Sequence, residues 1–438
     1  MRQVLILYVG SLLLMAGLWL MGGHGRPLAT TGEKTIEFWT YAGGGSAGRS
    51  TRFWRGLADR FEKENPGVRI LTVTDIDQGN YVQMLSTRVI GGTPPDVLIM
   101  DDNMAVGLNE EGLIAPLDDF LRRDPTYHVE DFPASMMRDG RVAGTQYWIP
   151  WYGGSSCLMY RTDLFEQAGV SPPRTWQEFL DVCRTLQAKL NMPHPLAFDV
   201  EVAFWLMPWV WQNGGEILSP DHRKVLIDSP EFIEAVQFVH DLMYQHHFMD
   251  SGLARGMLVK DLWSAGKVAM IIGGTWEIGM MDDNYPQWKG RWEVAPLPAG
   301  RLAASFYGGQ QLMMTRKCKY PELAWRFMVY ATRPENQKLW TDITGSPPAN
   351  LKTLEMTEFR REHAHFVRLK QAMLTGRNNP LAPFFAEIWY GRFSNVVLHR
   401  VMSDPNGDVA AAVREAVSQM QKIVDNYWAS HKHFVQGE

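Results

Sequence analysis

The sequence predicts an α/β protein built as two lobes with a ligand cleft between them, and three observations favour this class. The chain has 438 residues, which exceeds one ordinary domain and suits two lobes of roughly 200 residues each. Residues 35–100 alternate strand and helix patterns in the order βαβαβ, which is how an α/β lobe begins. Residues 147–160 are aromatic and contain paired glycines, a composition typical of a hinge between differently organised regions.

The first lobe is predicted from hydrophobic periodicity. Between the strands, residues 49–65 place Phe53, Trp54, Leu57 and Phe61 on one face of a helix. The apolar run Val97–Met100 has no polar interruption, which is typical of a buried parallel strand. The expected elements, alternately strand and helix, cover residues 35–41, 49–65, 68–74, 81–90 and 97–100.

The predicted hinge begins with extended, aromatic residues. Pro150 lacks a backbone donor, which suits a crossing segment or an edge strand. Gly153 and Gly154 permit a bend, and a second extended run, residues 156–160, leads into a helix. Further on, Thr175 and Glu178 have the spacing of a helix capping box.

Three segments carry a resemblance to a known family. They read GTPPDV at 92–97, YRTDLFEQAGVSPPRTWQEF at 160–179 and GKVAMIIGGTWEIG at 266–279. In this order they resemble the solute-binding proteins that serve sugar-importing ABC transporters, the family that includes maltose-binding protein. The resemblance extends over roughly residues 35–424.

The resemblance implies a periplasmic-binding-protein-like fold with several crossing segments. Its first lobe would comprise residues 33–151 and 307–346, and its second lobe residues 152–306 and 347–438. Such a protein binds a mono- or oligosaccharide between its lobes and delivers it to the membrane permease of the transporter. It is not an enzyme, and we expect a monomer without cofactor or metal.

Candidate ligand-binding residues stand at the ends of predicted strands and in the crossings, where the two lobes of such a fold face each other. Aromatic rings pack on the C–H faces of sugars, while carboxylates and amides pair with hydroxyl groups. The resemblance to maltose-binding proteins implies that Trp276 stacks on sugar, and by family position alone it implies that residues 377–379 reach the cleft. The candidates are Trp39, Tyr41, Asp101, Asp102, Asn103, Trp151, Tyr152, Trp276, Glu277, Tyr307, Gly308 and Gln310.

The amino-acid composition argues against nucleic-acid binding and against a zinc site. The net charge of −5 provides no basic stripe for nucleic acid, whereas the 17 tryptophans suit a protein that stacks rings on flat ligands. Trp205, Trp209 and Trp211 suit the core or the rim of the cleft equally well. None of the three cysteines, Cys157, Cys183 and Cys318, has the spacing of a zinc site, so we expect small buried residues; His246-His247 also lacks metal-ligand spacing.

Three alternatives stay open. Gly43, Gly45 and Gly48 match a dinucleotide-binding pattern with Asp75 beyond it, but Trp39 and Tyr41 crowd the strand end where close packing is needed. A glycine-rich loop lining the cleft explains these residues better. A carbohydrate hydrolase or lyase could use the same cleft, although adjacent Asp101 and Asp102 point opposite ways on an extended chain. A sugar-sensing subunit of a membrane signalling system is the third alternative.

The N-terminus predicts export. Arg2 precedes the apolar run Val4–Met21, which is longer than the ~7–15 residue core of a cleaved signal peptide and approaches the length of a membrane span. Residues 1–32 are therefore a signal peptide or a retained anchor. No cysteine follows the run, so we expect no lipid anchor, and an extracytoplasmic location.

Overall fold

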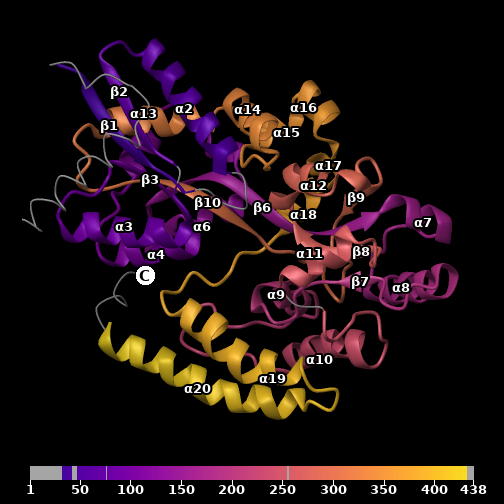
Figure 1. Cartoon of the computed structure of the whole chain (residues 1–438). Helices are drawn as coiled ribbons and strands as arrows, with labels where there is room; N and C mark the ends of the chain where they lie inside the picture. The colour runs from indigo at the N-terminus through magenta and orange to yellow at the C-terminus, as the bar shows by residue number, and fades with distance from the viewer. Residues whose placement is uncertain (1–31, 42–46, 75, 254–255, 432–438) are drawn as a thin grey trace, which may run out of the picture.

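The computed structural model describes residues 32–41, 47–74, 76–253 and 256–431. One sheet of eight strands runs through both halves of the molecule in the order β2-β1-β3-β10-β6-β8-β7, with β9 also paired to β6 (Figure 1). A small hairpin, β4 (Arg141–Val142) and β5 (Thr145–Gln146), lies apart from it. The strands are β1 (Lys34–Trp39), β2 (Val68–Val73), β3 (Val97–Asp101), β6 (Trp148–Arg161), β7 (Leu196–Ala197), β8 (Met270–Gly274), β9 (Trp292–Ala295) and β10 (Tyr307–Met314).

Helices pack around both halves of this sheet (Figure 1). Up to residue 139 the helical segments are α2 (Ala47–Glu64), α3 (Gln78–Ile90), α4 (Asp102–Glu110), α5 (Asp118–Arg123), η1 (Val129–Asp131) and α6 (Ala134–Asp139). The middle of the chain adds α7 (Thr162–Ala168), α8 (Trp176–Leu190), α9 (Ala203–Gln212), α10 (Pro230–Tyr244), α11 (Met257–Ser264), η2 (Thr275–Glu277), α12 (Ile278–Asn284) and η3 (Pro286–Trp288). The last part contains α13 (Pro321–Thr332), α14 (Pro334–Thr344), α15 (Leu351–Glu355), α16 (Thr357–Glu362), α17 (Ala364–Arg368), α18 (Lys370–Thr375), the π-helix η4 (Glu387–Leu398), α19 (His399–Val401) and α20 (Val409–Ser430).

The mixed α/β class predicted from the sequence is confirmed. β1 pairs in parallel with β2 and β3, as the βαβαβ order requires. The predicted capping box is present in part, because Thr175 accepts a hydrogen bond from the backbone of Glu178 at 3.1 Å. The prediction for the glycine-rich pattern is not tested, because Gly43, Gly45 and Asp75 lie outside the described residues. The predicted signal peptide or anchor also lies outside them, apart from residue 32.

β6 joins the two halves of the sheet. Its residues from Trp148 to Ser155 pair with β10, and its residues from Ser156 to Arg161 pair with β8 and β9. The strand is continuous through Gly153 and Gly154, where the sequence predicted a bend. The glycines are needed for close approach instead, since a Cβ atom on Gly154 would lie 2.7 Å from the Trp276 ring.

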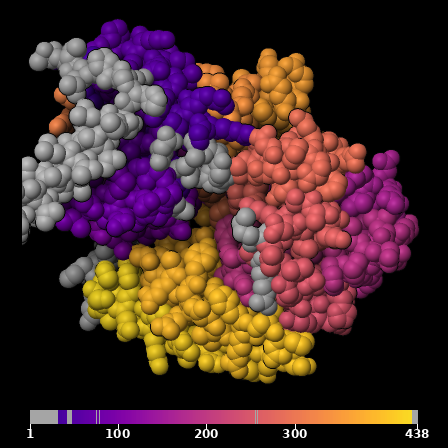
Figure 2. All heavy atoms as spheres, viewed as in Figure 1, coloured from indigo at the N-terminus to yellow at the C-terminus, as the bar shows by residue number. Residues whose placement is uncertain are grey.

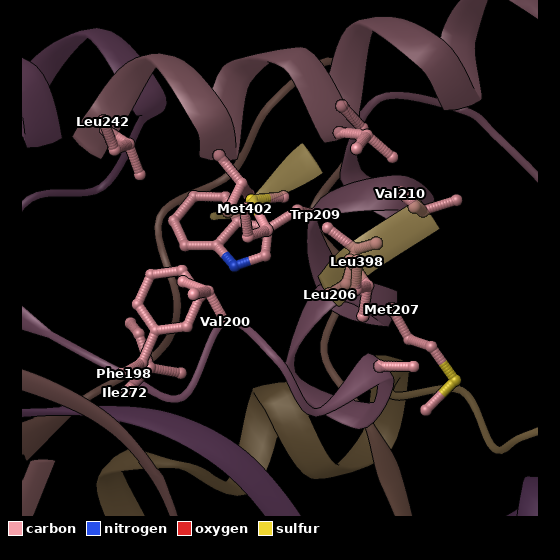
Figure 3. Packing of buried hydrophobic residues seen from close by; sticks show 14 of the residues in the cluster. Phe198, Val200, Leu206, Met207, Trp209, Val210, Leu242, Ile272, Leu398 and Met402 are labelled. Carbon is pink, nitrogen blue, oxygen red and sulfur yellow. The ribbon is translucent and has the colours of Figure 1, made fainter. Parts of the chain in front are cut away.

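The second half has a large aromatic core. Figure 3 shows Trp209 among Phe198, Val200 and Leu206, and its ring stacks on Phe198 with centroids 6.0 Å apart. Trp209 and Trp211 are buried, so the structure places both in the core rather than at the rim. Cys183 is buried in this core and Cys157 in another hydrophobic core cluster, as expected of small core residues.

The C-terminal segment reaches back to the first half of the molecule. Figure 2 shows it, in yellow, along the lower edge beneath the indigo N-terminal residues. The Tyr427 hydroxyl on α20 donates a hydrogen bond to the Glu110 carboxylate on α4. Within the described ranges, none of the helices has the length and apolar character needed to cross a membrane.

Candidate functional site

A cavity of about 370 Å³ opens between the two halves of the sheet. This volume is at the lower end of the range typical of small-molecule sites. Its wall comes from strand ends, helix starts and crossing segments of both halves. The lining residues are Tyr41, Ser50, Asp101, Asp102, Asn103, Tyr152, Phe204, Trp276, Phe306, Gly308, Gly309, Gln310, Trp340, Ser346, Asn379 and Tyr390.

The acidic side of the cavity lies at the carboxyl end of β3. Asp101 ends this strand and pairs in register with Gln310 of β10. Asp102 begins α4 and is almost fully buried; it accepts hydrogen bonds from the side chains of Asn378 at 2.5 Å and Gln311 at 3.5 Å. Burial raises the pKa of the Asp102 carboxyl because a low-dielectric site disfavours its charged form.

A second carboxyl lies behind Asp102. The Asn378 amide also donates to Asp139 at 2.9 Å, so one amide group bridges two acids. Burial raises the pKa of Asp139 to about 6, and the nearby charge of Asp102 acts in the same direction. The wall behind the cavity therefore brings two buried carboxyl groups together.

The opposite side of the cavity is aromatic. Trp276 lies in η2, directly after β8, and stacks on Trp205 with centroids 6.0 Å apart and planes inclined by 29°. The Ser155 backbone donates to the Thr275 hydroxyl at 2.9 Å, which fixes η2 against β6. Phe204 and Phe306 contact the indole edge-on, at centroid distances of 5.9 Å and 6.3 Å. One part of the indole is thus held by protein while another faces the cavity.

The C-terminal segment completes the wall. Tyr390 comes from the π-helix η4, a conformation that is rare and frequent at functional sites. The Asn379 amide donates to the Tyr390 hydroxyl at 3.4 Å. Among the described residues, the buried Asn379 Oδ1 and Trp340 Nε1 have no hydrogen-bond partner. Buried polar atoms are nearly always paired, so these two are exceptions beside the cavity.

Eight of the twelve candidate residues line the cavity, and all come from strand ends or crossings. They are Tyr41, Asp101, Asp102, Asn103, Tyr152, Trp276, Gly308 and Gln310. The other four, Trp39, Trp151, Glu277 and Tyr307, are placed elsewhere.

Strand alternation explains two of these displacements. Neighbouring side chains on a strand point to opposite faces. Tyr152 faces the cavity, so Trp151 is turned into the core, where it packs on Trp54 with ring centroids 4.5 Å apart. Gly308 likewise lines the cavity, and Tyr307 is fully buried beside it.

Local partners explain the other two. The indole of Trp39 is buried and donates to the Glu37 carboxylate at 2.8 Å. Glu277 accepts a hydrogen bond from the Gly274 backbone at 3.2 Å and pairs with Lys260 at 3.3 Å. Both side chains are engaged in contacts outside the cavity lining.

Sequence reasoning missed seven lining residues: Ser50, Phe204, Phe306, Gly309, Trp340, Ser346 and Tyr390. Asn379 lines the cavity, as its family position predicts, whereas Arg377 forms an ion pair with Glu216 at 2.7 Å. The dense aromatic run at 384–393 was the one available signal for Tyr390.

One acidic cluster with metal-ligand geometry exists in the described part of the chain. It comprises Asp342, Glu362 and His363, away from the cavity lining. The Lys338 ammonium group donates to Asp342 and to Glu362, each at 2.9 Å, and so already offsets part of the negative charge of the cluster.

The fold and the cavity define a two-lobed binding protein with its ligand site between the lobes. Residues 47–338 match the bacterial extracellular solute-binding protein family, and the chain belongs to that family.

Relatives identified by sequence are distant. The chain is 25% identical over 335 residues to the arabinooligosaccharide-binding protein of Halalkalibacterium halodurans, which covers 72% of each chain. It is 24% identical over 357 residues to the maltodextrin-binding protein MdxE of Bacillus subtilis, which covers 76% of this chain and 79% of that one.

Solved structures share the fold. The sugar-binding protein MalE from Xanthomonas citri superimposes with a TM-score of 0.81 at 20% identity, over 91% of this chain and 100% of that one. The GacH receptor of Streptomyces glaucescens superimposes with a TM-score of 0.73 at 21% identity, over 89% of this chain and 99% of that one. The predicted two-lobed fold is thereby confirmed.

Proposed function

We propose that this protein binds a carbohydrate in the cavity and delivers it to the membrane permease of an ABC importer. The observation that carries the proposal is the cavity wall, which combines aromatic faces with acidic and amide groups. Seven aromatic side chains line it: Tyr41, Tyr152, Phe204, Trp276, Phe306, Trp340 and Tyr390. The names of the sequence relatives, which bind arabinooligosaccharides and maltodextrins, support the same ligand class.

Carbohydrates need this combination of groups. Their C–H faces pack on aromatic rings, and Trp276 offers one that is already held in place by Trp205. Their hydroxyl groups both donate and accept, so they complete the unpartnered Trp340 Nε1 and Asn379 Oδ1. The carboxylates of Asp101 and Asp102 add acceptors on the opposite wall.

Transport requires the lobes to open and close, and the crossings suit such a hinge. We assign residues 33–151 and 307–346 to one lobe and residues 152–306 and 347–438 to the other. The change of partners in β6 between Ser155 and Ser156 supports a boundary close to residue 152. A ligand that contacts both lobes shifts the equilibrium toward the closed form by its additional contacts.

The same proposal places the protein outside the cytoplasm as a noncatalytic, monomeric receptor. The family supports the extracellular location and the binding role. Whether residues 1–32 are cleaved or retained decides only if the receptor is released or tethered to the membrane.

A ligand screen tests the proposal. The purified full chain should be melted in the presence of mono- and oligosaccharides, with amino acids and short peptides as controls. We expect at least one saccharide to raise the melting temperature in a dose-dependent way, with no release of cleavage products. Stabilisation by amino acids or peptides alone, or turnover of a saccharide, would contradict it.

A further inference from the structure

The Asn378 side chain holds two carboxyl groups together at one point of the cavity wall. Its Nδ2 atom donates to Asp102 Oδ2 at 2.5 Å and to Asp139 Oδ2 at 2.9 Å, so the separation of the two oxygens cannot exceed the sum of these distances. The orientation of the amide is fixed, because its Oδ1 accepts a hydrogen bond from the Asn379 backbone at 2.8 Å. Asp102 lines the cavity, so a single amide connects Asp139 to the ligand site.

A neutral amide cannot offset two negative charges. Carboxylates this close repel each other, and their repulsion grows where water is excluded. Burial raises the pKa of Asp102. Burial also raises the pKa of Asp139 to about 6, and the charge of Asp102 acts in the same direction while Arg138, its neighbour on α6, opposes it. The pair therefore binds a proton as the pH falls toward 6.

Hydrogen bonds decide which acid keeps the negative charge. Asp102 accepts from the Asn103 backbone at 3.0 Å and from the Gln311 side chain at 3.5 Å, in addition to Asn378. Donors of this kind favour the ionised form of a carboxyl group. Of these three donors, Asp139 shares Asn378. The singly protonated pair therefore carries its charge on Asp102, beside the cavity, and its proton on Asp139.

Two other ionisable side chains lie near Asp102. Tyr390 comes from η4, and burial raises the pKa of its phenol, with the charges of Asp102 and Asp101 acting in the same direction. The phenol therefore stays neutral at the pH values at which the pair changes its charge. Asp101 directly precedes Asp102, and its negative charge has the same sign as that of the pair.

We propose that Asp139 is a positioning residue for the ligand site, that it acts on Asp102 through Asn378, and that saccharide binding is coupled to the uptake of a proton by this carboxyl pair. The inference rests on the proposed carbohydrate function and adds a dependence on pH to the same cavity. The proton comes from solvent and is held by Asp139, and no covalent bond of the saccharide changes.

The coupling follows from what a saccharide does in the cavity. Its hydroxyl groups donate to the ionised Asp102, which stabilises the charge at that position. Its bulk replaces water, which strengthens the repulsion between Asp102 and an ionised Asp139. Both effects favour the singly protonated pair over the doubly charged pair. Affinity therefore rises as the pH falls from 8 toward 6, and it levels off once Asp139 is protonated in the free protein.

Calorimetry of the full chain measures this coupling. The probes are maltose, maltotriose, arabinobiose and arabinotriose, together with any saccharide that raises the melting temperature in the thermal screen. Each is titrated at pH 6.5 in two buffers of low and high ionisation enthalpy, and again at pH 5.5 and pH 8. If binding raises the pKa of Asp139 by about one unit, uptake is about half a proton per ligand at pH 6.5, and binding is about tenfold tighter at pH 5.5 than at pH 8.

A variant assigns the proton to Asp139. Asp139→Asn removes the titrating group and keeps a side-chain oxygen that can accept from Asn378. We expect its affinity at pH 8 to match that of the unaltered protein at pH 5.5 within about threefold, with no proton uptake. Asp181→Asn, on the exposed face of α8, is the matched control and should keep both the uptake and the pH dependence.

Each result decides one part of the inference. Saccharide binding without proton uptake, or with the same affinity at pH 5.5 and pH 8, would overturn the coupling, and the unaltered protein alone gives this answer. Uptake that persists in Asp139→Asn would overturn the role of Asp139. Failure of every saccharide to bind at any pH would instead refute the proposed carbohydrate function, and this inference with it.

Discussion

Replacing Trp276 with alanine should weaken saccharide binding without unfolding the protein. An indole side chain buries about 150–250 Å² when covered on all sides. Trp205, Phe204 and Phe306 already cover part of this one, so a ligand gains roughly 60–100 Å² of contact with it. At about 25 cal/mol per Å² this area contributes roughly 1.5–2.5 kcal/mol, or about 10- to 70-fold in affinity.

Stability should respond differently in a matched control. Trp263 is fully buried in the same half of the molecule, so Trp263→Ala should cost about 3–5 kcal/mol of unfolding free energy. Trp276 is only partly buried, and Trp276→Ala should cost less. Calorimetric titration and thermal melting of both variants separate the two effects. A large fall in melting temperature with unchanged affinity in Trp276→Ala would refute the assignment of this residue to the site.

Two further substitutions test the hinge and the buried acids. Gly345→Ala should destabilise the observed arrangement, because Gly345 has a φ of +68° and an added Cβ would overlap Gly279, which we assign to the other lobe. The melting temperature should fall and small-angle scattering should show a larger radius of gyration. An unchanged radius and melting temperature would show that this contact does not hold the lobes together. Asp139→Asn should raise the melting temperature near pH 7. The pKa of Asp139 is raised to about 6 in the folded protein, so the folded state binds more protons than the unfolded state, and stability falls as pH rises from ~4 through this value. The variant should lose this dependence, and an identical pH profile of melting temperature would contradict the shift.

Much of the fold could be predicted because its signals are local. The apolar run Val97–Met100 does form a buried strand, parallel to β1 and antiparallel to β10, and Asp101 and Asp102 follow it into the cavity. Trp276 follows β8 in the same way. Strand ends in an α/β sheet meet at one edge, so position in the sequence was enough to locate these side chains.

Other parts of the site depend on contacts that sequence spacing does not encode. Trp151 and Tyr152 are both aromatic, and the pairing register of β6 decides which one faces the cavity. Asn379 and Tyr390 come from a segment more than two hundred residues beyond the hinge, and Tyr390 lies on a π-helix. Helical periodicity of 3.6 residues does not apply there, so no face could be assigned from the pattern.

The most direct test of the central claim is a crystal structure of the protein with the saccharide that stabilises it most in the thermal screen. We predict one saccharide in the cavity between the lobes, with a sugar ring against Trp276 and polar groups of the ligand paired with Asp101, Asn379 Oδ1 and Trp340 Nε1. A saccharide bound outside this cavity, or a cavity left empty at saturating concentration, would contradict the account.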